Sequence, residues 1–282
     1  MQLQKAFLFL KTMEKNPIGI FDSGFGGLTV LKEIVALMPQ YQYYYLGDNA
    51  RAPYGPLPYE TVYAYTLQAV NWFFSKGCEL VILACNTASA KALRTIQQNN
   101  LPPSKKVLGI IRPTAEVIGN YSKTGHVGVL GTTGTVQSKS YVIEINKFFP
   151  DVTVHQRACP TWVAIVENNQ ADTPQASKEV KYEVDKLLQN DASIDAVLLA
   201  CTHYPLLQHQ IQKHVPAHVQ LVSQGQIVAK SLQEYLLAHP EIEEYCSKKE
   251  PISFFTTGSA ESFDAHAATF FGHQVASKTI VL

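Results

Sequence analysis

The fold of this chain is decided by residues 80–91, which read Leu-Val-Ile-Leu-Ala-Cys-Asn-Thr-Ala-Ser-Ala-Lys. The apolar run at 80–84 is typical of a strand buried on both faces, and the polar, then Ala-rich run at 86–93 predicts a helix start. Cys85 is therefore expected on the turn from a parallel strand into a helix, at the edge where open α/β sheets carry their chemistry. A thiol at a helix N-terminus ionises more easily, because unpaired amides and the helix dipole favour the thiolate.

A second copy of this pattern surrounds Cys201. Residues 196–203, Ala-Val-Leu-Leu-Ala-Cys-Thr-His, again place an apolar run before a Cys and two polar residues. Upstream, the stretches at 19–24 and 128–134 form another matching pair of strand and Gly-rich turn, separated by nearly the same interval. Two repeats at one interval indicate a duplicated α/β half. We therefore predict a pseudo-twofold site in which the two thiols face each other across a cleft.

The rest of the chain alternates short apolar strands with helical patterns, which predicts an α/β fold. We expect two pseudo-twofold-related lobes, each a mostly parallel sheet flanked by helices, with the active site in the cleft between them. The 282 residues are enough for two such lobes. The predicted boundaries are an N-terminal extension at 1–16, a first lobe at 17–110 together with 223–282, and a second lobe at 111–222.

Composition argues against several classes of protein. The formal net charge is zero, which argues against a nucleic-acid partner, and no apolar run reaches membrane-spanning length. The extension shows no motif, and Met13 could be the true start, so we expect residues 1–16 to be dispensable for chemistry. The cysteines are odd in number and scattered, which favours a reducing cytoplasm over a secreted disulfide framework: Cys78, Cys85, Cys159, Cys201 and Cys246.

Two facing thiols suit few chemistries. A redox disulfide usually carries Cys-x-x-Cys, which is absent here. A zinc site could use Cys85, Cys201 and His203 as ligands, but the paired ligand spacing of zinc sites and a fourth ligand are missing. Phosphate-ester chemistry would need an Arg six residues past a Cys, where this chain has Lys91 and Leu207. A Cys-His acyl-transfer site needs one nucleophile rather than two mirrored ones. Racemisation fits best, with a proton removed from one face of a carbon and delivered to the other.

Racemisation by thiols requires one cysteine as thiolate and the other as thiol, each with a partner that steers its proton. Asp22 for Cys85 and His203 for Cys201 are the candidate partners. The negative charge that develops on the substrate must be held by hydrogen-bond donors, each worth about 2.7–4 kcal/mol. The strand-to-helix turns offer such donors at Ser23, Asn86, Thr87, Thr132, Thr133, Thr135 and Thr202. No lysine stands out as a Schiff-base former and no dinucleotide fingerprint is visible, so we expect no cofactor and no metal.

Four short motifs resemble, in order, those of the glutamate racemases in the Asp/Glu racemase family: Asp22-Ser23-Gly24, Pro53-Tyr54-Gly55, Cys85-Asn86-Thr87 and Cys201-Thr202-His203. The similarity runs from about residue 18 to residue 207 and continues more weakly to the C-terminus. It implies a cofactor-independent, two-base interconversion of L- and D-glutamate in the cytoplasm, which supplies D-glutamate for peptidoglycan. An aspartate or hydantoin racemase of the same superfamily remains an alternative, and so does a non-catalytic amino-acid-binding module.

The resemblance also implies roles for particular residues. Cys85 would take the proton from D-glutamate and Cys201 from L-glutamate, and Asp22, His203 and Glu167 would assist the thiols. Family members are usually homodimers, and some with an N-terminal extension are activated by a peptidoglycan precursor, so both partners are implied here. The positions expected to contact the substrate are Asp22, Ser23, Pro53, Tyr54, Gly55, Asn86, Thr87, Thr132, Thr135, Thr202 and His203.

Overall fold

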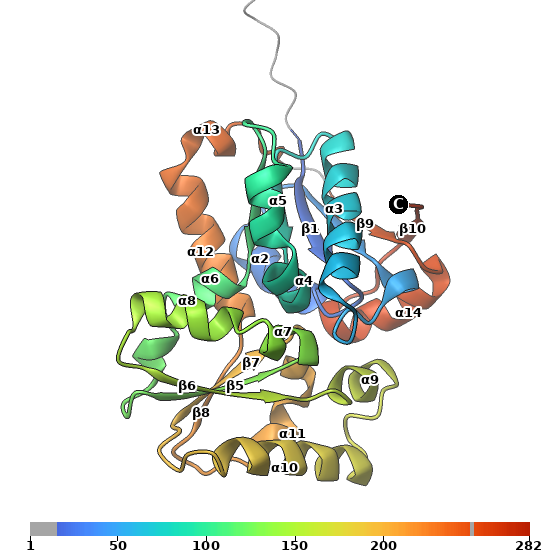
Figure 1. Cartoon of the computed structure of the whole chain (residues 1–282). Helices are drawn as coiled ribbons and strands as arrows, with labels where there is room; N and C mark the ends of the chain where they lie inside the picture. Colours follow the sequence, from blue (N-terminus) through green and yellow to red (C-terminus); the bar gives the residue numbers. More distant parts are fainter. Residues whose placement is uncertain (1–15, 249–250) are drawn as a thin grey trace, which may run out of the picture.

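The computed structural model describes residues 16–248 and 251–282, so the predicted extension lies outside the described residues except for Asn16. The strands form two sheets, and all neighbouring strands within each sheet run parallel. Figure 1 shows the two sheets in two bodies, one above the other, each flanked by helices. The predicted α/β class is therefore confirmed. The strands are β1 (Ile18–Asp22), β2 (Tyr43–Gly47), β3 (Leu80–Leu83), β4 (Lys106–Gly109), β5 (His126–Gly131), β6 (Thr153–Ala158), β7 (Ala196–Ala200), β8 (Gln220–Val222), β9 (Ser253–Thr256) and β10 (Ser277–Thr279).

The two sheets share one strand order. The first is ordered β10-β9-β2-β1-β3-β4 and the second β6-β5-β7-β8. The four consecutive strands β2-β1-β3-β4 thus correspond one by one to β6-β5-β7-β8. Within this shared order β3 and β7 occupy the same position. Cys201 follows β7 directly in the chain, and Cys85 follows β3 after one intervening residue. A duplicated half, as the repeats indicate, explains this correspondence.

The helices bury the central strands from both sides. Every residue of β1, β3 and β7 is buried, as expected for a parallel sheet with both faces covered. Ile20 packs into the core that contains Leu31, whereas Phe21 faces the opposite core with Phe73. Fully burying such side chains contributes roughly 1.5–3 kcal/mol each. The α-helices are α2 (Leu28–Leu37), α3 (Tyr59–Ser75), α4 (Asn86–Lys91), α5 (Leu93–Asn99), α6 (Ile111–Ala115), α7 (Thr133–Gln137), α8 (Ser140–Phe148), α9 (Trp162–Glu167), α10 (Pro174–Leu188), α11 (Gln208–Gln212), α12 (Gly225–Ala238), α13 (Pro240–Glu243) and α14 (Ala260–Phe271), with 3-10 turns η1 (Asn49–Arg51), η2 (Ile118–Tyr121) and η3 (Tyr204–Leu207).

The chain crosses between the two bodies twice. It leaves the upper body after β4 through α6, and returns after β8 through α12, which packs against α2 (Figure 1). We therefore keep residues 110 and 222 as the proposed lobe boundaries, and call the bodies the first and second lobe. None of the helices in the described residues is both long and apolar enough to cross a membrane.

Candidate active site

The carboxyl ends of six parallel strands meet at one cavity of about 250 Å³. Cys85 from the first lobe and Cys201 from the second both line it, with 5% and 6% of their surfaces exposed. The two-thiol hypothesis requires a single ligand space between the sulfur atoms, and this cavity provides it. Its volume suits a molecule smaller than a typical drug. The lining residues are Ser23, Ala52, Pro53, Tyr54, Gly55, Pro56, Cys85, Asn86, Thr87, Thr132, Thr133, Cys159, Pro160, Val163, Ala164, Glu167, Asn168, Cys201, Thr202 and His203.

Cys85 is the N-cap of α4, the helix that begins directly after it. The amide of Ala88 donates to the Cys85 sulfur at 3.4 Å, and the Cys85 thiol donates to Ser23 Oγ at 3.5 Å. Burial, reinforced by the negative charge of Asp22, raises the pKa of Cys85 to about 12. The hydrogen bonds with Ser23 and Ala88 act in the opposite direction on this pKa. Cys85 in the free protein is therefore a thiol at neutral pH and can donate a proton.

Cys201 is the first member of a chain of three side chains. Its sulfur lies 3.9 Å from His203 Nδ1, and His203 Nε2 lies 2.9 Å from Glu167 Oε1. Burial lowers the pKa of His203, but the hydrogen bonds and charges of Cys201 and Glu167 outweigh it and raise that pKa to about 10. An imidazolium at this position stabilises negative charge on the neighbouring sulfur. Glu167, which comes from α9, thus helps to keep His203 protonated beside the Cys201 sulfur.

Two of the predicted site residues lie behind the cavity wall. Asp22 is fully buried, where it accepts a hydrogen bond from the amide of Gly24 at 2.9 Å and one from the hydroxyl of Thr202 at 3.3 Å. Burial raises the pKa of Asp22, although His203 and these donors oppose the shift. Thr135 is also fully buried, and its amide donates to the cap hydroxyl of Thr132. Both therefore sit one layer away from the ligand space.

The polar groups of the wall connect the two lobes. The hydroxyls of Thr87 and Thr132 lie 2.9 Å apart, so the first lobe touches the second directly above the cavity. The Asn86 amide is fixed by Gln224, whose oxygen accepts its N–H at 2.8 Å, and by the hydroxyl of Tyr141, which donates to its oxygen at 2.5 Å. These bonds hold the donors of the wall in place before a ligand binds.

Tyr54 lines the cavity, but its hydroxyl is bonded within the first lobe. The hydroxyl donates to Asp48, which also pairs with Arg51, so this end of the ring is held inside the first lobe. Gly55 follows directly, and a Cβ there would lie 3.2 Å from Thr132. The backbone of the loop after β2 therefore packs closely against the second lobe at Thr132. The predicted contacts of Pro53, Tyr54 and Gly55 all fall on the wall of the cavity.

Several wall residues were not predicted. They come from the loop after β2 and from the segment that leads into α9, and they are Ala52, Pro56, Cys159, Pro160, Val163, Ala164 and Asn168. Cys159 is fully buried and also borders the cavity. The Pro-Thr-Trp stretch after Cys159 carried the only available signal, because a proline after a strand indicates a turn at the sheet edge.

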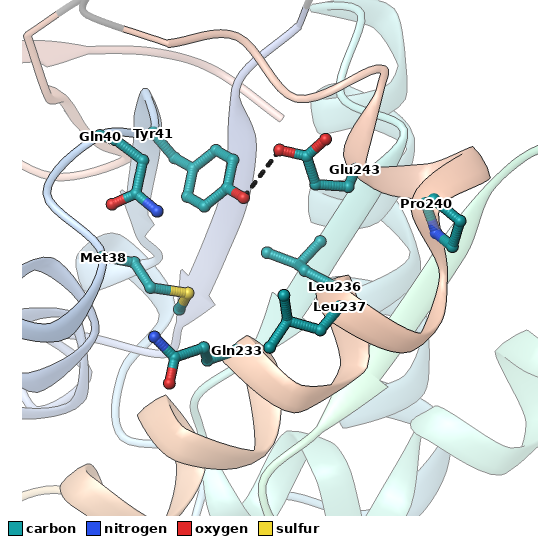
Figure 2. A pocket seen from close by; sticks show the side chains of 8 residues that line it. All are labelled: Met38, Gln40, Tyr41, Gln233, Leu236, Leu237, Pro240 and Glu243. Atoms are coloured by element: carbon teal, nitrogen blue, oxygen red, sulfur yellow. Dashed lines mark hydrogen bonds between the residues drawn. The ribbon is translucent and has the colours of Figure 1, made fainter.

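A second cavity of about 260 Å³ lies away from the strand ends, beside α12 and α13. Figure 2 shows the Tyr41 hydroxyl pointing toward Glu243, with which it forms a hydrogen bond of 2.9 Å, and leucines of α12 below it. Its lining residues are Met38, Gln40, Tyr41, Gln233, Leu236, Leu237, Pro240 and Glu243. None of these is a cysteine or histidine, so we place the chemistry in the cavity between Cys85 and Cys201.

Replacing Asp22 with Asn is expected to lower the pKa of Cys85, because the negative charge that opposes the thiolate is removed. Each unit of decrease raises the thiolate fraction about tenfold below the pKa. The measurement is the pH dependence of Cys85 alkylation by iodoacetamide in a Cys201→Ser background. Ser23→Ala is the matched control with the opposite sign, since the hydrogen bond with Ser23 lowers the pKa of Cys85. Equal alkylation profiles for the parent and the Asp22→Asn variant would contradict this coupling.

The chain resembles known proteins over nearly its whole length. The family model for Asp/Glu/hydantoin racemases matches residues 18–232. A glutamate racemase from Streptococcus gordonii is 38% identical over 96% of this chain and 100% of its own length. The crystal structure of a glutamate racemase isoform from Bacillus anthracis superposes with a TM-score of 0.87 at 36% identity, covering 95% of this chain and 98% of that one. The Escherichia coli glutamate racemase in complex with L-glutamate and the activator UDP-MurNAc-Ala reaches 0.71 at 26% identity, covering 90% and 95%.

Proposed function

Because the chain belongs to the Asp/Glu/hydantoin racemase family, we propose that it interconverts L- and D-glutamate with Cys85 and Cys201 as the two bases. The observation that carries this proposal is the single cavity that both thiols line from opposite lobes. The glutamate racemases of Streptococcus gordonii and Bacillus anthracis, similar over nearly the full length, support glutamate as the substrate. Asp22, His203 and Glu167 are the proposed assisting groups.

The proposed reaction moves one proton onto a sulfur and another proton off the other sulfur. In the L-to-D direction the Cys201 thiolate takes the α-proton, and the Cys85 thiol donates its proton to the opposite face of the same carbon. The enzyme then holds a Cys201 thiol and a Cys85 thiolate, which is the state needed for D-to-L turnover. The surroundings favour the protonated Cys85 of the first state, since burial and Asp22 raise the pKa of that thiol.

The charge that develops on the substrate needs donors on the wall. Ser23, Thr87, Thr132 and Thr202 offer hydroxyls there, and the turns that carry them offer backbone amides. In such a water-poor site each fixed donor lowers the activation barrier by about 2.7–4 kcal/mol. The cavity thereby replaces the electron sink that a cofactor would provide.

The decisive experiment is racemisation in deuterated water. L-Glutamate incubated with the protein should yield D-glutamate carrying deuterium at the α-carbon, because Cys85 exchanges its proton with solvent before donating it. Circular dichroism follows the loss of the L-glutamate signal, and mass spectrometry follows the incorporation of deuterium. Absence of both signals would overturn the proposal, and glutamate binding without label would favour a non-catalytic module. A higher kcat/KM for aspartate would instead assign the chain to the aspartate racemases.

The cellular role follows from the substrate. We propose that D-glutamate made in the cytoplasm supplies peptidoglycan synthesis, and that the enzyme works as a homodimer. The Escherichia coli relative, solved with a UDP-MurNAc-Ala activator, supports testing that compound as an activator here. A rise in kcat/KM on its addition, compared between the full chain and a chain that starts at Met13, measures whether the extension takes part.

A further inference from the structure

The second lobe carries a cluster of possible metal ligands at the end opposite the cavity. His126 is the first residue of β5, His155 lies near the start of β6, and Asp191 lies in the turn between α10 and β7. Because the cavity lies at the carboxyl ends of these strands, the cluster is separated from it by the length of the sheet. Among the described residues, these three form the group whose ligand atoms lie close enough together to hold a metal ion, within 4.8 Å of one another.

Strand pairing places the two histidines side by side. In the parallel pair β5–β6, His126 lies opposite Thr153, so His155 is two residues further along and its side chain points to the same face. The two imidazole rings are stacked, with centroids 5.9 Å apart and planes 15° from parallel. Because both histidines lie on paired strands, the backbone register fixes their rings on one face of the sheet.

Both histidines approach the same carboxylate oxygen. His126 Nδ1 lies 2.8 Å and His155 Nε2 lies 3.3 Å from the same oxygen, Asp191 Oδ2. Yet both ring nitrogens are buried and neither has a hydrogen bond of acceptable geometry. Buried polar atoms without such a partner call for an explanation, and an unseen ion is one of the few available.

The distances and the donor types fit zinc. Zn–N and Zn–O bonds of about 2.0–2.2 Å in a tetrahedral site place ligand atoms roughly 3.3 Å apart. The His155–Asp191 contact already has this length, and the 2.8 Å contact of His126 needs to lengthen slightly on binding. The carboxylate is held from behind, because the Ser193 amide donates to Asp191 Oδ1 at 2.7 Å and leaves Oδ2 facing the rings. Such an outer partner is typical of metal sites. The three side chains are 18–31% exposed, so the cluster lies near the protein surface.

We propose that His126, His155 and Asp191 bind one zinc ion that ties together β5, β6 and the turn before β7. The ion stabilises the second lobe and takes no part in the chemistry at the opposite end of the sheet. Two ion pairs between Asp191 and protonated imidazoles are the alternative, which predicts no metal dependence.

The experiment titrates metal-free, untagged protein with Zn²⁺ by calorimetry and with Co²⁺ by its visible absorption. A Cys85→Ser/Cys201→Ser background removes the thiols of the cavity as competing ligands. We expect one equivalent per chain, and a melting temperature raised by roughly 5–10 °C when zinc exceeds its Kd 100-fold. Both effects should vanish in His155→Gln and in Asp191→Asn, which keep the approximate shape of each side chain.

His209→Ala is the matched control, because His209 pairs with Asp172 at 2.7 Å at the surface and belongs to no group of three. It should bind zinc like the parent. In the wild-type background, His155→Gln should also keep its glutamate racemase activity. Absence of binding at roughly 100-fold excess of zinc over protein, or binding that survives both cluster variants, would overturn the proposal. A failure of racemisation would leave this outcome untouched, so the two proposals are tested separately.

Discussion

Replacement of Cys85 or Cys201 by Ser is expected to lower glutamate racemisation roughly 10²- to 10⁴-fold, the usual contribution of a positioned acid or base. Serine keeps the shape of the side chain, but its hydroxyl is far less acidic than a thiol and cannot cycle a proton at neutral pH. Both cysteines line the same cavity from opposite lobes, so each has access to one face of a bound carbon. Loss of one therefore blocks the delivery or the removal of a proton in each direction.

The two variants should differ in the exchange that remains. With Cys85→Ser, Cys201 still reaches the α-proton of L-glutamate, so any residual deuterium uptake is confined to L-glutamate. With Cys201→Ser it is confined to D-glutamate. Mass spectrometry of the separated enantiomers measures both. Cys246→Ala is the control, since Cys246 is buried in the first lobe, where its thiol donates to the carbonyl of Ile242. Near-normal racemisation by either serine variant would refute the two-base scheme.

Much of this site could be predicted because it follows from strand ends. The apolar runs before Cys85 and Cys201 form β3 and β7, and in parallel sheets such ends gather at one edge. The predicted helix start after Cys85 is α4, and the Cys85 sulfur caps it by accepting the amide of Ala88. These features depend on neighbours in the chain, and the sequence displays them directly.

What the pattern did not show depends on how the lobes pack. Val163 and Ala164 have the composition of core residues, and only the placement of α9 against the first lobe brings them to the cavity. Asp22 lies at a strand end like the cysteines, but its carboxylate accepts a hydrogen bond from the Gly24 amide and is buried behind the cavity wall. Gln224 holds Asn86 from a position far along the chain, a contact that no local pattern encodes. The helices α8 and α14 were likewise not indicated.

Gly26→Ala is expected to cause the other large loss, because this residue is the point where the first lobe meets the Cys201 turn. A Cβ at Gly26 would lie 2.2 Å from Thr202 Oγ1 and 2.4 Å from His203 Nδ1, so the turn must shift. The same contact is reinforced by Thr29, whose hydroxyl donates to the Thr202 carbonyl at 2.9 Å. A displacement of about 1 Å at a catalytic group costs roughly 10²-fold in rate, and overpacking costs about 1–3 kcal/mol of stability.

Gly24→Ala separates this effect from a general sensitivity of the turn. Both glycines lie between β1 and α2, but a Cβ at Gly24 would meet its nearest neighbour, Glu167 Oε1, at an ordinary 3.5 Å. The Gly24→Ala variant should keep kcat within about threefold of the parent value. The Gly26→Ala variant should lose racemisation and also the raised pKa of His203. NMR titration of the His203 ring protons measures that pKa. Urea unfolding compares the stabilities of the two proteins. Equal racemase activities of the Gly24→Ala and Gly26→Ala variants would contradict this prediction. They would show that the contact at Gly26 is not needed to position Cys201 and His203 opposite Cys85.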